Sequence, residues 1–140
     1  MEVSDVRRRV RSAIEESRRQ AEERRVKKDT AVREWERVLA DVAIPVFHQI
    51  ALALNAEGYR YQVTTPGAAV RLVPERGGEE FLELALDTEH DDPAVTLRST
   101  RGRGRRSVTT ERSLGAGSAV GTLTDGALAE AVIEDLKPHL

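Results

Sequence analysis

The sequence contains no cysteine, one methionine, one tryptophan and only four other aromatic residues. Without cysteine, disulfide bridges, thiolate metal sites and cysteine nucleophiles are excluded. No uninterrupted apolar run approaches the 18 residues of a membrane-spanning helix, and the first residues, MEVSDVRRRVRSAIEES, lack the apolar core of a signal peptide. We therefore expect a soluble, cytoplasmic protein that does not engage a membrane.

The signatures of common enzyme sites are also missing. The sequence has no phosphate-binding loop, no dinucleotide-binding glycine pattern and no G-x-S-x-G nucleophile turn. His90 stands among acidic residues, but their spacing is not that of a calcium-binding loop. His48 is expected to be a partly buried structural histidine. We therefore predict a non-enzymatic protein with no catalytic residue, no metal site and no cofactor.

Charge is abundant but nearly balanced. The 140 residues include 22 Lys and Arg against 24 Asp and Glu, so the net charge of −2 points to no class of partner. Nineteen of the basic residues are arginine. The length suits one domain, which we place at residues 29–140, with residues 1–28 as an appendage.

The appendage has the pattern of a charged helix over residues 2–28. Val3, Val6, Val10 and Ile14 recur at spacings of three and four, which places them on one side of a helix. Beyond Ile14 the apolar stripe thins out among charged residues. Two interpretations follow, because a marginal helix needs a packed face to persist in water: a solvated helix, or an oligomerisation segment completed by another copy or by a partner.

A second helix is predicted over residues 29–57. Its apolar stripe is dense and of core type. Pro45 lacks a backbone N–H, so we expect a kink near residues 41–45, and Gly58 suits the position that ends the helix.

After Gly58 the apolar period changes from 3.6 to 2. Five short runs joined by turn sequences predict an antiparallel meander with one face on the core. These runs are 59–65, 68–75, 79–88, 94–100 and 105–113.

The chain should end in a helix over residues 124–137, with Thr124 as N-cap, after a flexible connector GAGSAVGT. The predicted fold class is therefore α+β. A long N-terminal helical region kinked at Pro45 precedes a five-stranded antiparallel meander, and the C-terminal helix packs on one face of the sheet.

The segment RSTRGRGRRSVTTER, residues 98–112, holds six arginines and two glycines. A two-residue turn at Gly102 and Arg103 would supply the glycine of a type II′ turn. It would also pair Leu97 with Val108 and Val95 with Thr110, placing apolar residues opposite one another. We therefore predict a protruding basic hairpin.

Guanidinium groups on such a hairpin suit phosphates, and a two-stranded ribbon fits a DNA major groove. The candidate contacts for a polyanion or an acidic partner are Arg98, Arg101, Arg103, Arg105 and Arg106. No aromatic residue lies within 98–112 to stack on bases, and charged tips also serve only to keep a ribbon soluble. The preceding stretch 79–92 holds seven acidic residues and no Lys or Arg, so the fourth run should carry opposite charges at its two ends.

Two hypotheses follow from these patterns. The first is a protein-interaction module that self-associates or docks onto a larger protein through the charged N-terminal helix and the exposed edges or faces of the sheet. A homo-oligomer or a protein partner is expected for it. The second is nucleic-acid binding through the hairpin 98–112.

Overall fold

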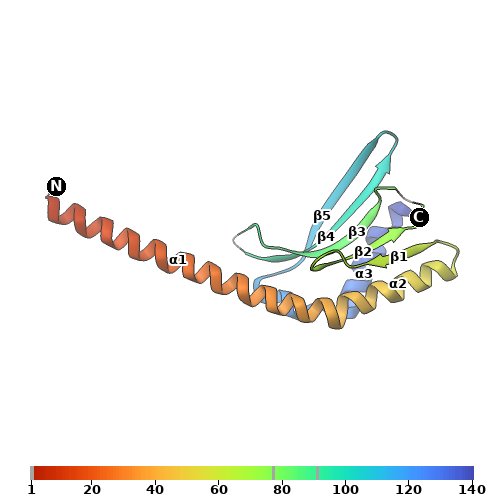
Figure 1. Ribbon diagram of the computed structural model, residues 1–140, viewed down its shortest axis with the longest axis horizontal. Coiled ribbons are helices and arrows are strands. Elements are labelled where there is room, and N and C mark those ends of the chain that lie inside the picture. The colour runs from red at the N-terminus through yellow and green to blue at the C-terminus, as the bar shows by residue number, and fades with distance from the viewer. Residues whose placement is uncertain (1, 77, 91) are drawn as a thin grey trace.

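A computed structural model describes residues 2–76, 78–90 and 92–140. The chain begins with a long helical rod that lies partly outside the rest of the molecule (Figure 1). Helix α1 spans Val3–Val38, a π-helical turn spans Leu39–Ala43, and helix α2 spans Ile44–Ala56. The two predicted helical segments are thus continuous across residue 28. The change of pattern there marks where the helix meets the body of the protein, because burial begins at Ala31.

The predicted kink is confirmed, and it takes the form of the π-helical turn. Ile44 donates its N–H to the carbonyl of Leu39, five residues earlier. Pro45 follows at once and has no N–H with which to continue the α-helical ladder. The rod changes direction at this turn, so that α2 runs beneath the sheet (Figure 1).

The sheet is the predicted antiparallel meander, with strand order β1-β2-β3-β4-β5. The strands are β1 Tyr61–Thr64, β2 Ala69–Pro74, β3 Phe81–Asp87, β4 Ala94–Arg103 and β5 Arg106–Ala116. Helix α3, Asp125–Leu136, and a short 3₁₀ turn, Lys137–His139, end the chain.

The hydrophobic core lies between one face of this sheet and the helices. Trp35 of α1 and Phe47 of α2 are buried in it, and the Trp35 indole donates a hydrogen bond of 2.8 Å to the carbonyl of Ala68. The sheet contributes alternate residues, as its period of 2 requires. The core residues from the sheet and α3 are Tyr61, Val70, Leu72, Leu82, Leu84, Val95, Leu97, Leu128, Val132 and Leu136.

The N-cap prediction for α3 is confirmed, because the Thr124 hydroxyl accepts a hydrogen bond from the Ala127 N–H. The prediction of a flexible connector is wrong. Residues Gly117–Thr122 form a 3₁₀ helix packed against α1, with Val120 fully buried and the Gly121 carbonyl bonded to Arg37 at 2.7 Å. A Cβ at Gly121 would lie 2.4 Å from the Glu34 carboxylate, so glycine permits this close approach.

The predicted hairpin forms, but its turn and register differ from the prediction. Arg103 pairs with Arg106, so the turn residues are Gly104 and Arg105. Gly104 has a φ of 66°, as the first position of a type II′ turn requires.

The resulting pairs are also different from those expected. Leu97 lies opposite Arg112, and Val108 lies opposite Arg101. Apolar pairing did not set this register, because no core covers the outer half of the hairpin and β5 is exposed over most of its length.

Candidate interaction surfaces

Several exposed apolar side chains lie in a row on the projecting part of α1, residues 3–30, which we call the arm helix. Every residue of it is exposed except the half-buried Asp5. The predicted oligomerisation residues form one stripe, the arm stripe, with exposed fractions of 76, 44, 52 and 46%; they are Val3, Val6, Val10 and Ile14.

The arm stripe lies on the side of the helix that enters the core further along. Ser17 is three residues after Ile14 and so lies on the same side of the helix as the arm stripe. Ser17 and the buried Trp35 are 18 residues apart, which is five full turns of the helix, so their side chains point in the same direction. One continuous side of α1 is therefore covered by the body from Ala31 onward and uncovered before it.

Two groups of charged residues on the arm helix differ in their ion pairing. Three arginines pair with an acidic residue three positions earlier, in the pairs Asp5–Arg8, Glu16–Arg19 and Glu22–Arg25. A second group lines the groove at Val10 and Ile14 and consists of Glu15 and three arginines, Arg7, Arg11 and Arg18, which we call the border arginines. Within the described part of the chain, the border arginines form no ion pair.

The structure does not gather the predicted polyanion-binding arginines in one place. Arg98 lies on the sheet face that is turned away from the helices, and Arg101 lies on the other face, where it donates a hydrogen bond to the Pro138 carbonyl. Arg105 and Arg106 are exposed at the tip of the hairpin. The side chain of Arg103 lies outside the described residues.

The hairpin nevertheless projects beyond the sheet. The last pair between β3 and β4 joins Phe81 to Thr100, so residues 101–108 lie past the end of β3 (Figure 1). We call residues 101–108 the distal hairpin. The acidic β3–β4 turn and this basic tip stand at opposite ends of β4, as expected.

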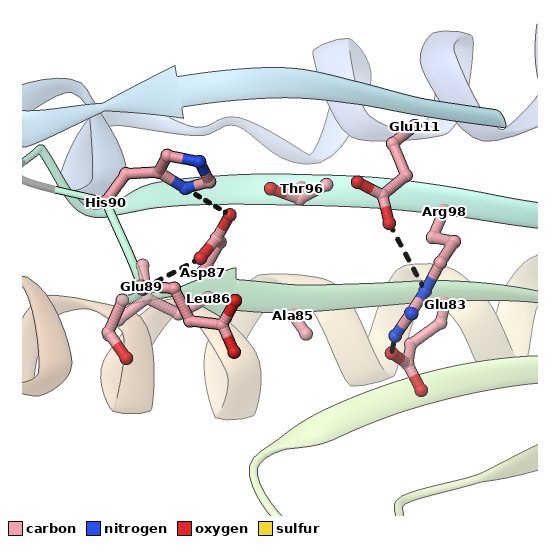
Figure 2. Close-up of a pocket in the computed structure, with 10 residues that line it drawn as sticks. Glu83, Ala85, Leu86, Asp87, Glu89, His90, Thr96, Arg98 and Glu111 are labelled. Carbon is pink, nitrogen blue, oxygen red and sulfur yellow. Dashed lines mark hydrogen bonds and ion pairs between the residues drawn. The ribbon is translucent and has the colours of Figure 1, made fainter.

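A ladder of alternating charge crosses the open face of the sheet, and sequence reasoning missed it. Adjacent strands place Arg71 opposite Glu83, Glu83 opposite Arg98, and Arg98 opposite Glu111. Glu83 is buried and accepts hydrogen bonds from both Arg71 and Arg98. The bond from Arg98 is 2.7 Å long and is drawn in Figure 2. The sequence shows that successive strands carry residues of opposite charge. Only the observed strand register shows that these residues lie directly opposite one another.

Electrostatics keep Glu83 ionised despite its burial. Burial raises the pKa of the carboxyl, but the hydrogen bonds from Arg98 and Arg71 outweigh it and lower the pKa below that of an ordinary glutamate. Arg71 also lies over the Phe81 ring, 4.3 Å from its centre. The ladder therefore stitches four strands together and leaves Arg98 little freedom to bind an external anion.

A shallow pocket of about 350 Å³ adjoins this ladder on the open face (Figure 2). Ala85 and Thr96 form its floor, and the Asp87–His90 pair, 3.0 Å apart, stands at the far end from Arg98. In the described ranges no group of three or more His, Asp and Glu side chains is placed to hold a metal ion. His48 is exposed on α2 rather than partly buried, so the structural role expected for it is wrong.

Sequence reasoning also missed a buried histidine at the end of the chain. The His139 side chain is 1% exposed and shares a hydrogen bond of 2.8 Å with the Ser99 hydroxyl, while its Nδ1 lies 3.8 Å from the Glu80 carboxylate. The order Ser, His, Glu is that of a hydrolytic triad. The distance of 3.8 Å between His139 and Glu80 is too long for a hydrogen bond. The backbone of Ser99 pairs with neighbouring strands on both sides, so its amide is not free to bind an oxyanion.

By length and composition alone, the helical rod contains a stretch of 18 residues that is apolar enough to cross a membrane. Of this stretch, 33% is buried within the protein. Core helices pass the same test, and α2 places Val46, Phe47, Ile50 and Ala51 in the hydrophobic core. Packing thus accounts for these four residues, whereas Leu52 of α2 is 70% exposed.

Comparison of the chain with protein-family models, with curated proteins and with solved structures finds no match.

Proposed function

We propose that this protein is a non-enzymatic interaction module that contacts another protein chain through the arm helix. One observation carries the proposal: the arm helix stands outside the body with its arm stripe exposed, although the same side of α1 is packed from Ala31 onward. Helices in water obtain most of their stability from packing of an apolar face. A protein surface that completes the arm stripe would supply it.

The contact should be specific to one side of the arm helix. A photo-crosslinking amino acid at Ile14, in the arm stripe, should give a defined adduct in the cells that make the protein. The same group at Ser12, about 160° away around the helix, should not. Adducts of equal yield at both positions, or adducts at neither, would contradict the proposal.

Self-association is one form of this function, and it is separately measurable. Light scattering of the full chain would report a dimer or larger oligomer, and Val10→Asp with Ile14→Asp should then return the mass to that of a monomer. A monomeric mass for the full chain excludes self-association and leaves only a different partner.

A second candidate function is polyanion binding by the distal hairpin. It is favoured by the exposure of Arg105 and Arg106 at a tip that lies beyond β3. Binding to duplex and single-stranded DNA and RNA should weaken steeply with salt. Arg105→Ser with Arg106→Ser should weaken it further, whereas the control pair Arg33→Ser with Arg76→Ser, also exposed, should not. Equal losses in the two double variants, or no binding at low salt, would remove this candidate.

A further inference from the structure

The chemistry of the arm stripe narrows what can cover it. Its residues are three valines and one isoleucine, whose branched side chains pack well as knobs against another helix. Helices that lie in a lipid surface instead use Trp, Phe or Leu on the apolar face. The arm stripe therefore suits a helix more than a lipid surface.

The border arginines set the charge of the occupant. Arg11 and Arg18 are seven residues apart and Arg7 is one turn before Arg11, so the three line one border of the arm stripe. Arg8 and Arg19, on the far side, are neutralised by Asp5 and Glu16. In the described ranges the border arginines alone of these five form no ion pair. Glu15 is the one acidic residue in the lining of their groove, so the three arginines leave a net positive charge beside the arm stripe.

A second copy of this chain does not supply the missing carboxylates. In a parallel coiled coil with Val10 and Ile14 in the seam, Arg11 and Arg18 would lie opposite Val6 and Ala13 of the other copy. In an antiparallel pair the same border would meet itself, arginine against arginine. Both arrangements leave the border arginines without an acidic partner, and the second sets like charges against each other.

We infer that the occupant of the arm helix is an amphipathic helix of a different protein, with acidic side chains beside its apolar stripe. This inference rests on the proposed function and names the chemistry of the partner. Such a helix would cover the arm stripe with apolar side chains and place a carboxylate about every seven residues against Arg11 and Arg18.

Two synthetic helical peptides can test the inference with the full-length protein. Both carry leucine at the seam positions, and they differ only in the flanking positions, which are all Glu in one and all Lys in the other. In low salt, fluorescence anisotropy should show the Glu peptide binding at least about tenfold more tightly than the Lys peptide. Raising the salt concentration should reduce this preference.

Charge reversal supplies the matched control. Arg11→Glu with Arg18→Glu should invert the preference, so that the Lys peptide binds more tightly. Arg8→Glu with Arg19→Glu makes the same change of charge on the far side of the helix and should preserve the preference for the Glu peptide. Circular dichroism of both double variants verifies that the arm helix remains helical.

The inference is overturned by equal affinity for the two peptides, or by equal effects of the two double variants. It is also overturned if the full chain binds vesicles of phosphatidylglycerol and phosphatidylcholine but neither peptide, or if it forms a dimer that both peptides fail to dissociate. A side-specific adduct at Ile14 in cells together with no preference for the Glu peptide rejects this inference while the proposed function stands. Adducts at neither position reject the proposed function itself.

Discussion

The two halves of the helical rod share a backbone conformation but differ in what holds them helical. From residue 31 onward the rod is embedded, and Trp35, Val38 and Phe47 are almost completely buried. From residue 3 to residue 30 its side chains are exposed or, at Asp5, half-buried. Its ion pairs join residues three apart on the helix, except that Lys27 lies 3.7 Å from the Asp92 carboxylate of the β3–β4 turn. Such exposed pairs stabilise a helix weakly and are screened by salt.

The difference shows what an apolar stripe does in each setting. In the embedded half it is part of the hydrophobic core, whereas in the arm helix its side chains are exposed. Substitutions in the two halves should therefore affect different properties, the free energy of unfolding in one and binding in the other. Five predictions follow that comparison, from the largest expected effect to the smallest.

Trp35→Ala should give the largest loss of stability. It removes the largest buried side chain and its hydrogen bond to the Ala68 carbonyl, and we expect about 3–5 kcal/mol less free energy of unfolding. Urea denaturation followed by far-ultraviolet circular dichroism measures it. Trp35→Phe keeps most of the volume and should lose clearly less; an effect of Trp35→Ala below that of Trp35→Phe would refute the assigned core position.

Glu83→Gln should give the next largest loss, about 1–3 kcal/mol, because it leaves the guanidinium groups of Arg71 and Arg98 without their shared buried carboxylate. Glu111→Gln is the matched control, since Glu111 is exposed and 3.8 Å from Arg98. It should lower stability by less than about 1 kcal/mol. Comparable losses in the two variants would contradict the ladder as described.

Acid should lower the free energy of unfolding through the Glu83 carboxylate. The lowered pKa of Glu83 means that its stabilisation is complete above the pKa of the unfolded chain, near about 4.3, and is lost as the pH falls below that value. In Glu83→Gln the unfolding free energy should therefore depend less on pH in this range. An unchanged acid slope would contradict the assignment.

His139 should give a smaller effect at milder acidity. Burial lowers its pKa, so between about pH 6.5 and the folded-state pKa the unfolded chain binds more protons and stability falls as the pH falls. His139→Gln should remove this slope, while His48→Gln, at an exposed position, should retain it. The measurement is the midpoint of urea unfolding at several pH values from 5 to 7.

Val10→Ala with Ile14→Ala should have the smallest effect on stability. Both side chains are exposed on the arm helix, so we expect the unfolding free energy of the body to change by no more than about 0.5 kcal/mol. Binding of a partner should weaken strongly in the same variant. A large loss of stability would mean that the arm stripe packs on the body.

Much of the fold was predictable, because each element has its own periodicity. The strong stripe of residues 31–54 predicts the embedded helix, and the change to a period of 2 after Gly58 predicts the meander that the structure contains. Pro45 and Thr124 acted locally, through a missing N–H and a capping hydroxyl, and both predictions are confirmed.

The hairpin register was not predictable, because RGRGRR offers two glycines that can each begin a type II′ turn. The expected register, with the turn at Gly102 and Arg103, places apolar residues opposite one another. Apolar pairing determines the register only where a hydrophobic core covers both strands. The structure instead places Leu97 opposite Arg112, whose side chain reaches the Asp135 carboxylate and the Ala131 carbonyl on α3. Arg112 is thereby satisfied without entering the core.

Some features of the candidate interaction surfaces were predictable from the sequence and others were not. The arm stripe was found from spacing alone, because Val3, Val6, Val10 and Ile14 lie on one helix. The charge ladder and the Ser99–His139 contact escaped prediction, because their members are joined only by strand pairing or by the packing of the chain end. The expected cluster of five arginines was dispersed for the same reason, since residues three apart on a strand point to opposite faces.

The sequence by itself therefore determined the type and order of the helices and strands and the side of α1 that is apolar, because these depend on residues close together in the chain. Only the tertiary structure decided which arginines of the sheet are neutralised, where the hairpin turns and where the apolar side of α1 ceases to be covered. Those outcomes depend on contacts between distant segments, whose energies the local pattern does not contain.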